Sequence, residues 1–331
     1  MNKKDFIVRA RIQESINRFN GTDYESLKLW VKDKTNIDLR PTQILHAHEI
    51  VHHPKIVCLA PPRFGKSVVV ELMDLRDSSL NPGEDGRIWA PKEDQAKESL
   101  KIQREAIARS PILSAFIARE NGKLKNATTG YKFMNGSNWK CFGIYGNFEG
   151  ENASILRLEE YDDLDIDIVK DRVMARGSAA NDNGMPTRVR ITGTIQAGKG
   201  NIYEAFQNKA YYVCTLFDVE TGLKLGYYDK DIIEQARADL TEEAFFRIWK
   251  LVFTEARNFI PEKYIRMASS KGLSLKLGLI DPATLISPYT PEGMVFAGLD
   301  MGASGEQKKS SRYVAVFMEV IGGKRILIGA K

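Results

Sequence analysis

The chain has 331 residues, of which 43% are hydrophobic and 27% are charged, enough for a large core and about two domains. No apolar stretch is long enough for a membrane helix, and charges in the first residues argue against a signal peptide. The net charge of +5 is compatible with a polyanionic partner, but equally with an ordinary solvated surface. The three widely spaced cysteines predict buried thiols in a reducing compartment, and hence a soluble intracellular protein.

Apolar residues at helical spacing predict a helix over residues 3–34, with Asn20-Gly21 ending its first part and a second short helix at 23–34. A loop at 38–43 then enters another helix with Pro41 near its first position.

A strand at 56–59 leads into a turn and a new helix, and the turn carries a phosphate-binding pattern. Residues 60–67 read APPRFGKS, which satisfies G-x-x-x-x-G-K-[ST] except that Ala60 replaces the first glycine. Backbone N–H groups at such a turn cradle phosphates. Lys66 is expected to bridge phosphate oxygens and Ser67 to ligate magnesium, so the pattern predicts a site for ATP and Mg²⁺.

Strand-like and helix-like segments alternate after this turn, which predicts an α/β fold with a parallel sheet. The predicted elements are helices at 67–75 and 92–109, strands at 87–90, 155–158 and 188–192, and a hairpin of 131–134 with 138–142.

Acidic residues follow the strand at 155–158. We assign Glu159 to the metal and Glu160 to activation of the attacking water, because site residues gather at the carboxyl ends of strands in open α/β sheets. Asp162 and Asp163 are the alternative pair for these roles. The structural alternative is an acidic helix N-terminus stabilised by the helix dipole, which Asp162, Asp163, Asp165 and Asp167 fit well.

Two further groups are candidates for contact with the γ-phosphate. Arg63 lies inside the phosphate loop, where an arginine stabilises developing charge, although a purely structural ion pair is the alternative. Thr192-Gly193-Thr194 ends the next strand, and we expect its hydroxyls, Thr194 among them, to sense the nucleotide.

The character of the sequence changes after residue 216. A long charged helix is predicted over 229–251, and a proline-containing connector covers 279–293. New strands are predicted from 294, at 313–320 and at 325–328, as if a second domain begins there.

Six stretches, in this order, resemble motifs of the large subunit of tailed-phage terminases, the motors that package double-stranded DNA. They are LRPTQ at 39–43, PPRFGKS at 61–67, ILRLEEYDD at 155–163, ITGTIQAGKGNIYEAF at 191–206, LTEEAFFRIWKLVFTEARNFIP at 240–261 and FAGLDMGAS at 296–304.

The resemblance implies a P-loop NTPase (RecA/ASCE-like) fold, with a mainly parallel sheet flanked by helices. The expected domains are an N-terminal helical segment at 1–38, the ATPase core at 39–215, a helical linker subdomain at 216–293 and the first strands of an RNase H-like nuclease domain at 294–331.

It also implies site residues. Gln43 is expected to read the adenine, and Asp300 to be a metal ligand of the nuclease domain, whose other carboxylates are not evident, so we expect no competent DNA cleavage. The family often places an arginine finger where this chain has residues 146–150 without one; Arg157, Arg172 and Arg176 remain open as substitutes. The expected nucleotide-binding set is Gln43, Pro61, Pro62, Arg63, Phe64, Gly65, Lys66, Ser67 and Thr194.

The implied partners are double-stranded DNA, the portal protein, the small terminase subunit and further copies of the chain in a ring, expected to be a pentamer, although the isolated protein is expected to be a monomer. The implied location is the host cytoplasm and, transiently, the procapsid. Two alternatives remain: another RecA-like motor such as a helicase, and a nucleotide-binding module that does not hydrolyse.

Overall fold

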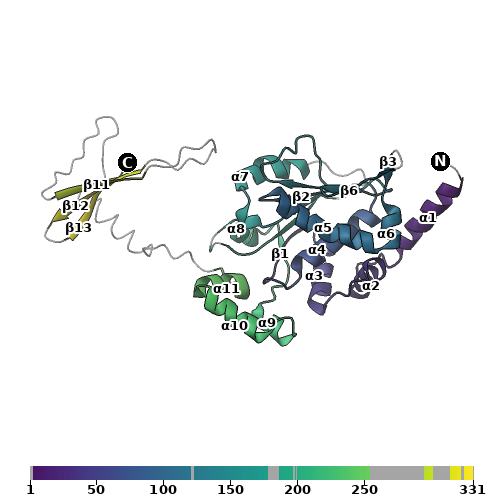
Figure 1. Cartoon of the computed structure of the whole chain (residues 1–331), viewed down its shortest axis with the longest axis horizontal. Coiled ribbons are helices and arrows are strands. Elements are labelled where there is room, and N and C mark those ends of the chain that lie inside the picture. Colours follow the sequence, from purple (N-terminus) through teal and green to yellow (C-terminus); the bar gives the residue numbers. More distant parts are fainter. Residues whose placement is uncertain are drawn as a thin grey trace. The chain divides into compact units, whose positions relative to one another are not determined.

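The computed structural model describes residues 3–120, 123–177, 186–196, 198, 200–253, 294–300, 314–321 and 324–330. The chain divides into two units, Met1–Ala256 and Arg257–Lys331, which are described separately. Figure 1 follows the chain from the N-terminal helix α1 to the strands of the second unit.

The first unit is built on an eight-stranded sheet in the order β10-β1-β9-β8-β2-β7-β6-β5. Every pairing from β10 to β7 is parallel, and the last two pairings are antiparallel. The strands are β1 (Lys55–Leu59), β2 (Asp85–Ala90), β5 (Asn126–Ala127), β6 (Gly130–Lys132), β7 (Asn138–Gly143), β8 (Ile155–Leu158), β9 (Arg188–Gly193) and β10 (Tyr212–Val213). The predicted parallel sheet and its hairpin, now β6–β7, are confirmed.

Alternate residues of β1, β2 and β8 enter two hydrophobic clusters, one on each face of the sheet. In β1, Ile56 and Cys58 belong to the first cluster, and Val57 and Leu59 to the second. This division follows from the two-residue period of a strand, so both faces must be covered by helices.

Helices cover both faces. The first cluster takes residues from α1 (Lys3–Asn17), α2 (Tyr24–Thr35), α3 (Pro41–His52), α4 (Lys66–Leu80), α5 (Glu93–Arg109) and α6 (Pro111–Phe116). The second cluster takes residues from η1 (Tyr161–Asp163), α7 (Ile166–Ile168), η2 (Val169–Val173), η3 (Met174–Gly177) and α8 (Asn201–Gln207). A short antiparallel pair, β3 (Arg119–Glu120) with β4 (Lys123–Leu124), follows α6.

A third hydrophobic cluster holds α9 (Val219–Lys224), α10 (Lys230–Asp239) and α11 (Glu242–Lys250) against the turn after β1. Figure 1 shows these three helices grouped together beside α3. The prediction of one long helix over 229–251 was wrong in detail, because the chain leaves the helix at Leu240. Thr241 then caps a new helix, its hydroxyl accepting a hydrogen bond from the N–H of Ala244 at 3.2 Å.

The described part of the second unit is an antiparallel sheet in the order β11-β12-β13, formed by Met294–Asp300, Val314–Ile321 and Lys324–Ala330. Asp300 is the last residue of β11. The assignment of this sheet to a nuclease domain, like the four-part division of the chain, stays a prediction. Among the helices that the structure describes, none combines the length and apolar character that crossing a membrane requires.

Candidate functional site

The turn between β1 and α4 has the backbone of a phosphate loop. Gly65 adopts a left-handed conformation (φ +93°), and a Cβ there would lie 2.2 Å from the side-chain nitrogen of Gln43. Arg63 is also left-handed, with φ +62°. Pro61 and Pro62 have no N–H, and the N–H of Phe64 is bonded to the Pro61 carbonyl at 3.3 Å. The loop donors left for a ligand are therefore the N–H groups of Arg63 and Gly65.

Helix α4 begins directly after this turn with an open N-terminus. No side chain in the described ranges caps it, so the N–H groups of its first turn are available to an anion. Lys66 and Ser67 are partly exposed, and neither side chain makes a hydrogen bond or close ion pair within the described residues. The lysine and the hydroxyl are thus free to meet phosphate and metal.

Glu159 follows β8 and is buried, with only 5% of its surface exposed. Its Oε1 accepts hydrogen bonds from Ser99 Oγ at 2.6 Å and from Arg157 Nη2 at 2.5 Å. Its Oε2 accepts one from Thr192 Oγ1 at 2.6 Å. Burial alone would raise the pKa of this carboxyl, but the Arg157 guanidinium and the two hydroxyls outweigh it and hold the pKa at about 2. Glu159 is therefore a fixed anion.

The side chain of Glu160, unlike that of Glu159, is not held by hydrogen bonds or ion pairs among the described residues. The residue has a left-handed backbone (φ +48°) and is partly exposed. Ser67, Glu159 and Glu160 all line one hollow of about 460 Å³. The structure thus brings the end of the phosphate loop and the two glutamates together.

The alternative acids lie elsewhere. Asp162 caps the segment after β9: its carboxylate accepts the N–H of Gln196 at 2.9 Å and of Ile202 at 2.7 Å. Asp163 is exposed, and neither residue lines the hollow that holds Ser67. This geometry favours the pair next to the strand.

Three other expected nucleotide-binding residues, Gln43, Phe64 and Thr194, do not line the hollow that holds Ser67. Gln43 accepts the Arg40 N–H at 2.9 Å and donates to the Gly65 carbonyl at 3.2 Å, so it supports the loop itself. Phe64 points away from the phosphate side, buried in the third hydrophobic cluster with 1% of its surface exposed. Thr194 is partly exposed and does not line the hollow.

Of the three candidate finger arginines, Arg157 is fully buried and bonded to Glu159, which makes it unavailable to a neighbouring subunit. Arg172 stacks on the Phe148 ring at 4.6 Å. Arg176 is partly exposed in η3.

Sequence reasoning missed Ser99 on α5, which bonds to Glu159, and Glu71 on α4, which bonds to Ser99. No motif marks them, since both lie in ordinary helical stretches. The contact of Arg157 with Glu159 could have been predicted from the sequence. Arg157 lies two residues before Glu159 at the end of a strand, so the two side chains belong to the same face of the sheet.

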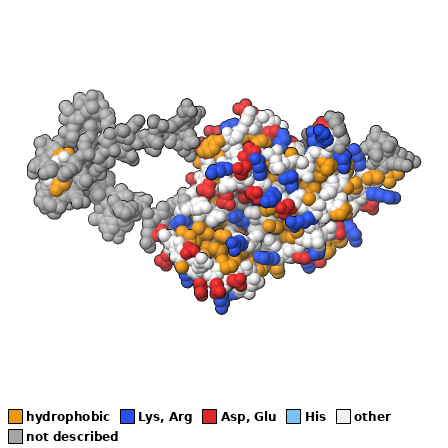
Figure 2. Space-filling view, viewed as in Figure 1, with side chains coloured by type: hydrophobic (Ala, Val, Ile, Leu, Met, Phe, Trp, Pro, Cys, Tyr) orange, Lys and Arg blue, Asp and Glu red, His pale blue; other side chains and the backbone are white. Residues whose placement is uncertain are grey.

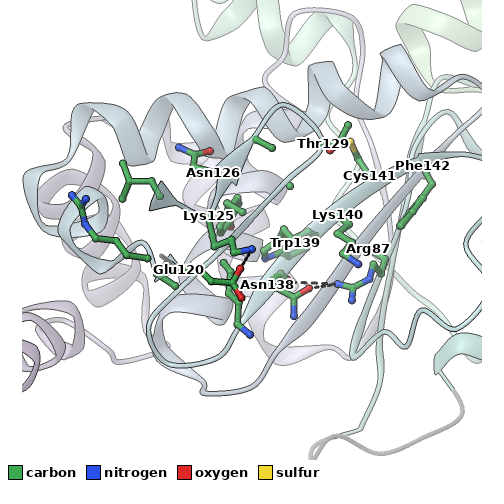
Figure 3. A pocket seen from close by; sticks show the side chains of 17 residues that line it. Arg87, Glu120, Lys125, Asn126, Thr129, Asn138, Trp139, Lys140, Cys141 and Phe142 are labelled. Carbon is green, nitrogen blue, oxygen red and sulfur yellow. Dashed lines mark hydrogen bonds and ion pairs between the residues drawn. The ribbon is translucent and has the colours of Figure 1, made fainter. Parts of the chain in front are cut away.

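A second hollow, of about 790 Å³, lies at the other end of the sheet and is lined mainly by β4–β7 (Figure 3). Its cations are largely paired: Lys140 with Glu151 at 2.5 Å, Arg87 with Glu151 at 2.9 Å, and Lys125 with Glu120. It contains no residue of the phosphate loop. Among the expected site residues, Ser67, Glu159 and Glu160 line the smaller hollow instead.

No protein-family model matches the sequence, and no curated protein matches it either. Solved structures do match its fold. The bacteriophage HK97 large terminase aligns with a TM-score of 0.53 at 14% identity, over 92% of this chain and 67% of that one. The large terminase of a thermophilic bacteriophage aligns with a TM-score of 0.50 at 11% identity, over 89% of this chain and 68% of that one.

The ATPase domain of the Thermus phage P74-26 large terminase aligns over 67% of this chain and 97% of that domain, with a TM-score of 0.52 at 14% identity. Nearly the whole of that domain is thus represented here. In the sheet, β9 lies between the loop strand β1 and the acidic strand β8. The first unit therefore has the P-loop NTPase fold of the ATPase domain of bacteriophage large terminases.

Proposed function

We propose that this chain is the ATPase part of a large terminase subunit, which hydrolyses ATP with Mg²⁺ and uses the energy to move double-stranded DNA into a capsid. One observation carries the proposal: Ser67, Glu159 and Glu160 line the same hollow, within the fold of terminase ATPase domains.

The triphosphate binds at the start of α4. The uncapped N–H groups of the first turn and of Gly65 contact its phosphate oxygens, and Lys66 neutralises their charge. The support from Gln43 keeps Gly65 in the left-handed conformation that this turn requires.

The residues present suit magnesium, which prefers oxygen ligands and keeps several waters. The hydroxyl of Ser67 and the carboxylate of Glu159 supply such oxygens in the hollow. The Oε2 atom of Glu159 receives one hydrogen bond, from Thr192, and so retains a lone pair on that side. Bound magnesium would neutralise charge on the phosphates.

Glu160 orients and deprotonates the attacking water, because its carboxylate lies in the hollow without a partner among the described residues. Arg63 is exposed on the loop, and its side chain makes no hydrogen bond or ion pair with the described residues, so it is available to γ-phosphate charge. Thr192 connects the site to β9 through its bond to Glu159.

DNA contacts are expected to be phosphate contacts from Lys and Arg, and hence sensitive to salt and indifferent to sequence. Figure 2 shows Lys and Arg side chains mixed with Asp and Glu on the visible face of the first unit, without one continuous basic stripe. A mixed surface suits a weak grip by each subunit, shared among the copies of a ring. The portal protein and the small terminase subunit complete the proposed assembly.

The test is ATP turnover by the wild type and by Lys66→Ala and Glu160→Gln, with and without double-stranded DNA. Lys101→Ala is the control, because Lys101 is an exposed helix residue whose ion pair in the described part of the chain is with Glu98. We expect Mg²⁺-dependent turnover that both site variants lose by at least about 100-fold and the control retains. Turnover that survives in both site variants would refute the assignment.

The same preparation separates the alternatives. A helicase would unwind a tailed duplex in the presence of ATP, whereas a packaging motor moves along the duplex without separating its strands. A binding module would retain Mg-ATP but show no turnover, with or without DNA.

A further inference from the structure

Ser99 occupies an unusual position on helix α5. The buried face of this helix is apolar at Ala96, Leu100 and Ile107, and Ser99 shares it with one other polar residue, Gln103. A serine inside a helix commonly faces solvent or bonds to the preceding turn. Here its Oγ lies 2.6 Å from Glu159 Oε1 and 2.7 Å from Glu71 Oε1, so the hydroxyl joins two carboxylates from different elements.

A chain of buried polar side chains supports this hydroxyl from the far side. Gln103 lies one turn beyond Ser99, and its Nε2 donates to Glu71 Oε2 at 2.5 Å. The Tyr131 hydroxyl donates to Gln103 Oε1 at 2.5 Å. Both Gln103 and Glu71 are fully buried. Because such groups are costly to bury without partners, these contacts restrict all of them to one arrangement.

The arrangement fixes Glu159 from three sides. Ser99 holds Oε1 from α5, Arg157 holds the same atom from β8, and Thr192 holds Oε2 from β9. Glutamate has one more side-chain torsion than aspartate, and therefore needs more restraint to present an oxygen at a fixed point. Arg157 provides charge, whereas the two hydroxyls set the plane of the carboxylate.

We propose that Ser99 is a positioning residue of the ATPase site, which, held by Glu71 and Gln103, orients the Glu159 carboxylate toward magnesium. The inference rests on the proposed function, since it concerns the same site. Ser99 itself lines the hollow that contains Ser67, Glu159 and Glu160, so its substitution acts directly at the metal side of the site.

The experiment is a Mg²⁺ titration of the binding of a fluorescent, non-hydrolysable ATP analogue, followed by turnover. In Ser99→Ala we expect the Mg²⁺ concentration for half-maximal binding to rise about five- to tenfold, with analogue affinity in the absence of Mg²⁺ unchanged. Turnover should fall by a similar factor at low Mg²⁺ and recover in part at high Mg²⁺. A general loss of folding would weaken binding with and without the metal alike.

Three further variants complete the design. Ser99→Thr keeps the hydroxyl and should restore most of the wild-type Mg²⁺ dependence, whereas Ser79→Ala is a matched control. Ser79 is a buried serine of α4 whose hydroxyl donates to the Arg76 carbonyl at 2.9 Å, and it does not line the hollow. If Ser99→Ala does not fold, Ser99→Cys retains the volume with a weaker donor and should show a smaller shift in the same direction.

The outcomes are distinct. A wild type that does not bind the magnesium complex of the analogue would refute the proposed function, and this inference with it. A wild type that binds it, together with a folded Ser99→Ala or Ser99→Cys whose Mg²⁺ dependence is unchanged, would overturn the role of Ser99 alone.

Discussion

The hydroxyl of Tyr228 donates a hydrogen bond of 2.9 Å to the carbonyl oxygen of Pro62. Tyr228 precedes helix α10, and Pro62 lies in the phosphate loop. The ring of Phe64, two residues further along the loop, is buried in the same cluster, 5.7 Å from the ring of Phe217. The segment between α9 and α10 is therefore hydrogen-bonded to the loop, and the three helices pack against it through the third hydrophobic cluster. A change in the conformation of the loop on binding phosphate would alter these contacts.

We expect Tyr228→Phe to weaken nucleotide binding about two- to tenfold and to lower the free energy of unfolding by about 1 kcal/mol. The ring remains packed, but the partly buried Pro62 carbonyl loses its partner, and a hydrogen bond contributes about 0.5–1.5 kcal/mol. Equilibrium titration with an ATP analogue and urea unfolding measure the two effects.

Tyr212→Phe is the control for this substitution, because its hydroxyl also forms one bond, to Glu49 at 3.1 Å, away from the loop. An equal loss of nucleotide affinity in both variants would show that the bond to Pro62 has no special role.

Gly65→Ala is expected to abolish nucleotide binding. The residue has φ +93°, and the added Cβ would lie 2.2 Å from the Gln43 side-chain nitrogen, so the glutamine must move and the loop loses its support. Gly83→Ala is a matched control: its φ is +74°, and nothing lies within 4 Å of the added Cβ.

Thermal unfolding of the two glycine variants then separates two contributions to the loss of stability, backbone strain and the collision with Gln43. Backbone strain of about 1 kcal/mol is common to both, and any excess in Gly65→Ala measures the collision with Gln43. Equal destabilisation of the two variants, with binding retained in Gly65→Ala, would contradict the described loop.

Glu71 gives the protein a pH dependence of unusual sign. Burial raises the pKa of this carboxyl to about 7 from an ordinary 4.5, although Arg157 opposes the shift. Between these pH values the folded protein holds a proton that the unfolded chain has lost, so stability falls as the pH rises and levels off above about 7. A shift of this size corresponds to an effect on the order of 3 kcal/mol.

Glu71→Gln, which is neutral in both states, should remove this decline between about pH 5 and 7 and be more stable than the wild type at about pH 8. Urea unfolding at several pH values measures it, with the exposed Glu105→Gln on α5 as the control. An unchanged slope in Glu71→Gln would mean that Glu71 is ionised in the folded protein.

The sheet was predictable because its strands are short apolar runs that end at the turns and acids of the phosphate loop and of residues 159–160. The phosphate loop and residues 159–160 were expected to lie close together, because parallel strands have their carboxyl ends at the same edge of a sheet. The surroundings of Glu159 were not predictable in this way. Ser99 lies 60 residues from Glu159 in the chain, and no local pattern encodes contact over that distance.

Helix α4 shows a second reason why the surroundings of the site could not be predicted from the sequence. Its acidic residues Glu71, Asp74 and Asp77 would be expected on a solvated face, yet all three are buried. Their partners come from other elements: Ser99 for Glu71 at 2.7 Å, and Arg190 for Asp77 at 2.5 Å. Phe64 was expected at the nucleotide, but α9–α11 offer it an apolar cluster that only the tertiary fold assembles.

Arg157 and Arg63 are expected to respond in opposite ways to the same substitution. Arg157→Gln leaves Glu159 without its buried counter-charge, and breaking such a pair typically costs about 3–5 kcal/mol. It should lower stability strongly, and turnover with it. Arg63→Gln removes an exposed side chain with no hydrogen-bond or ion-pair partner among the described residues, so stability should change by less than about 0.5 kcal/mol.

Turnover of Arg63→Gln should nevertheless fall by about 10- to 1,000-fold, with nucleotide affinity nearly unchanged, because Arg63 is proposed to act on charge that develops only during hydrolysis. Single-turnover hydrolysis and analogue binding, measured on the same samples, provide the comparison. A fully active Arg63→Gln would remove this arginine from the mechanism and direct attention to Arg172 and Arg176. A stable, active Arg157→Gln would instead mean that the buried pair does not hold Glu159.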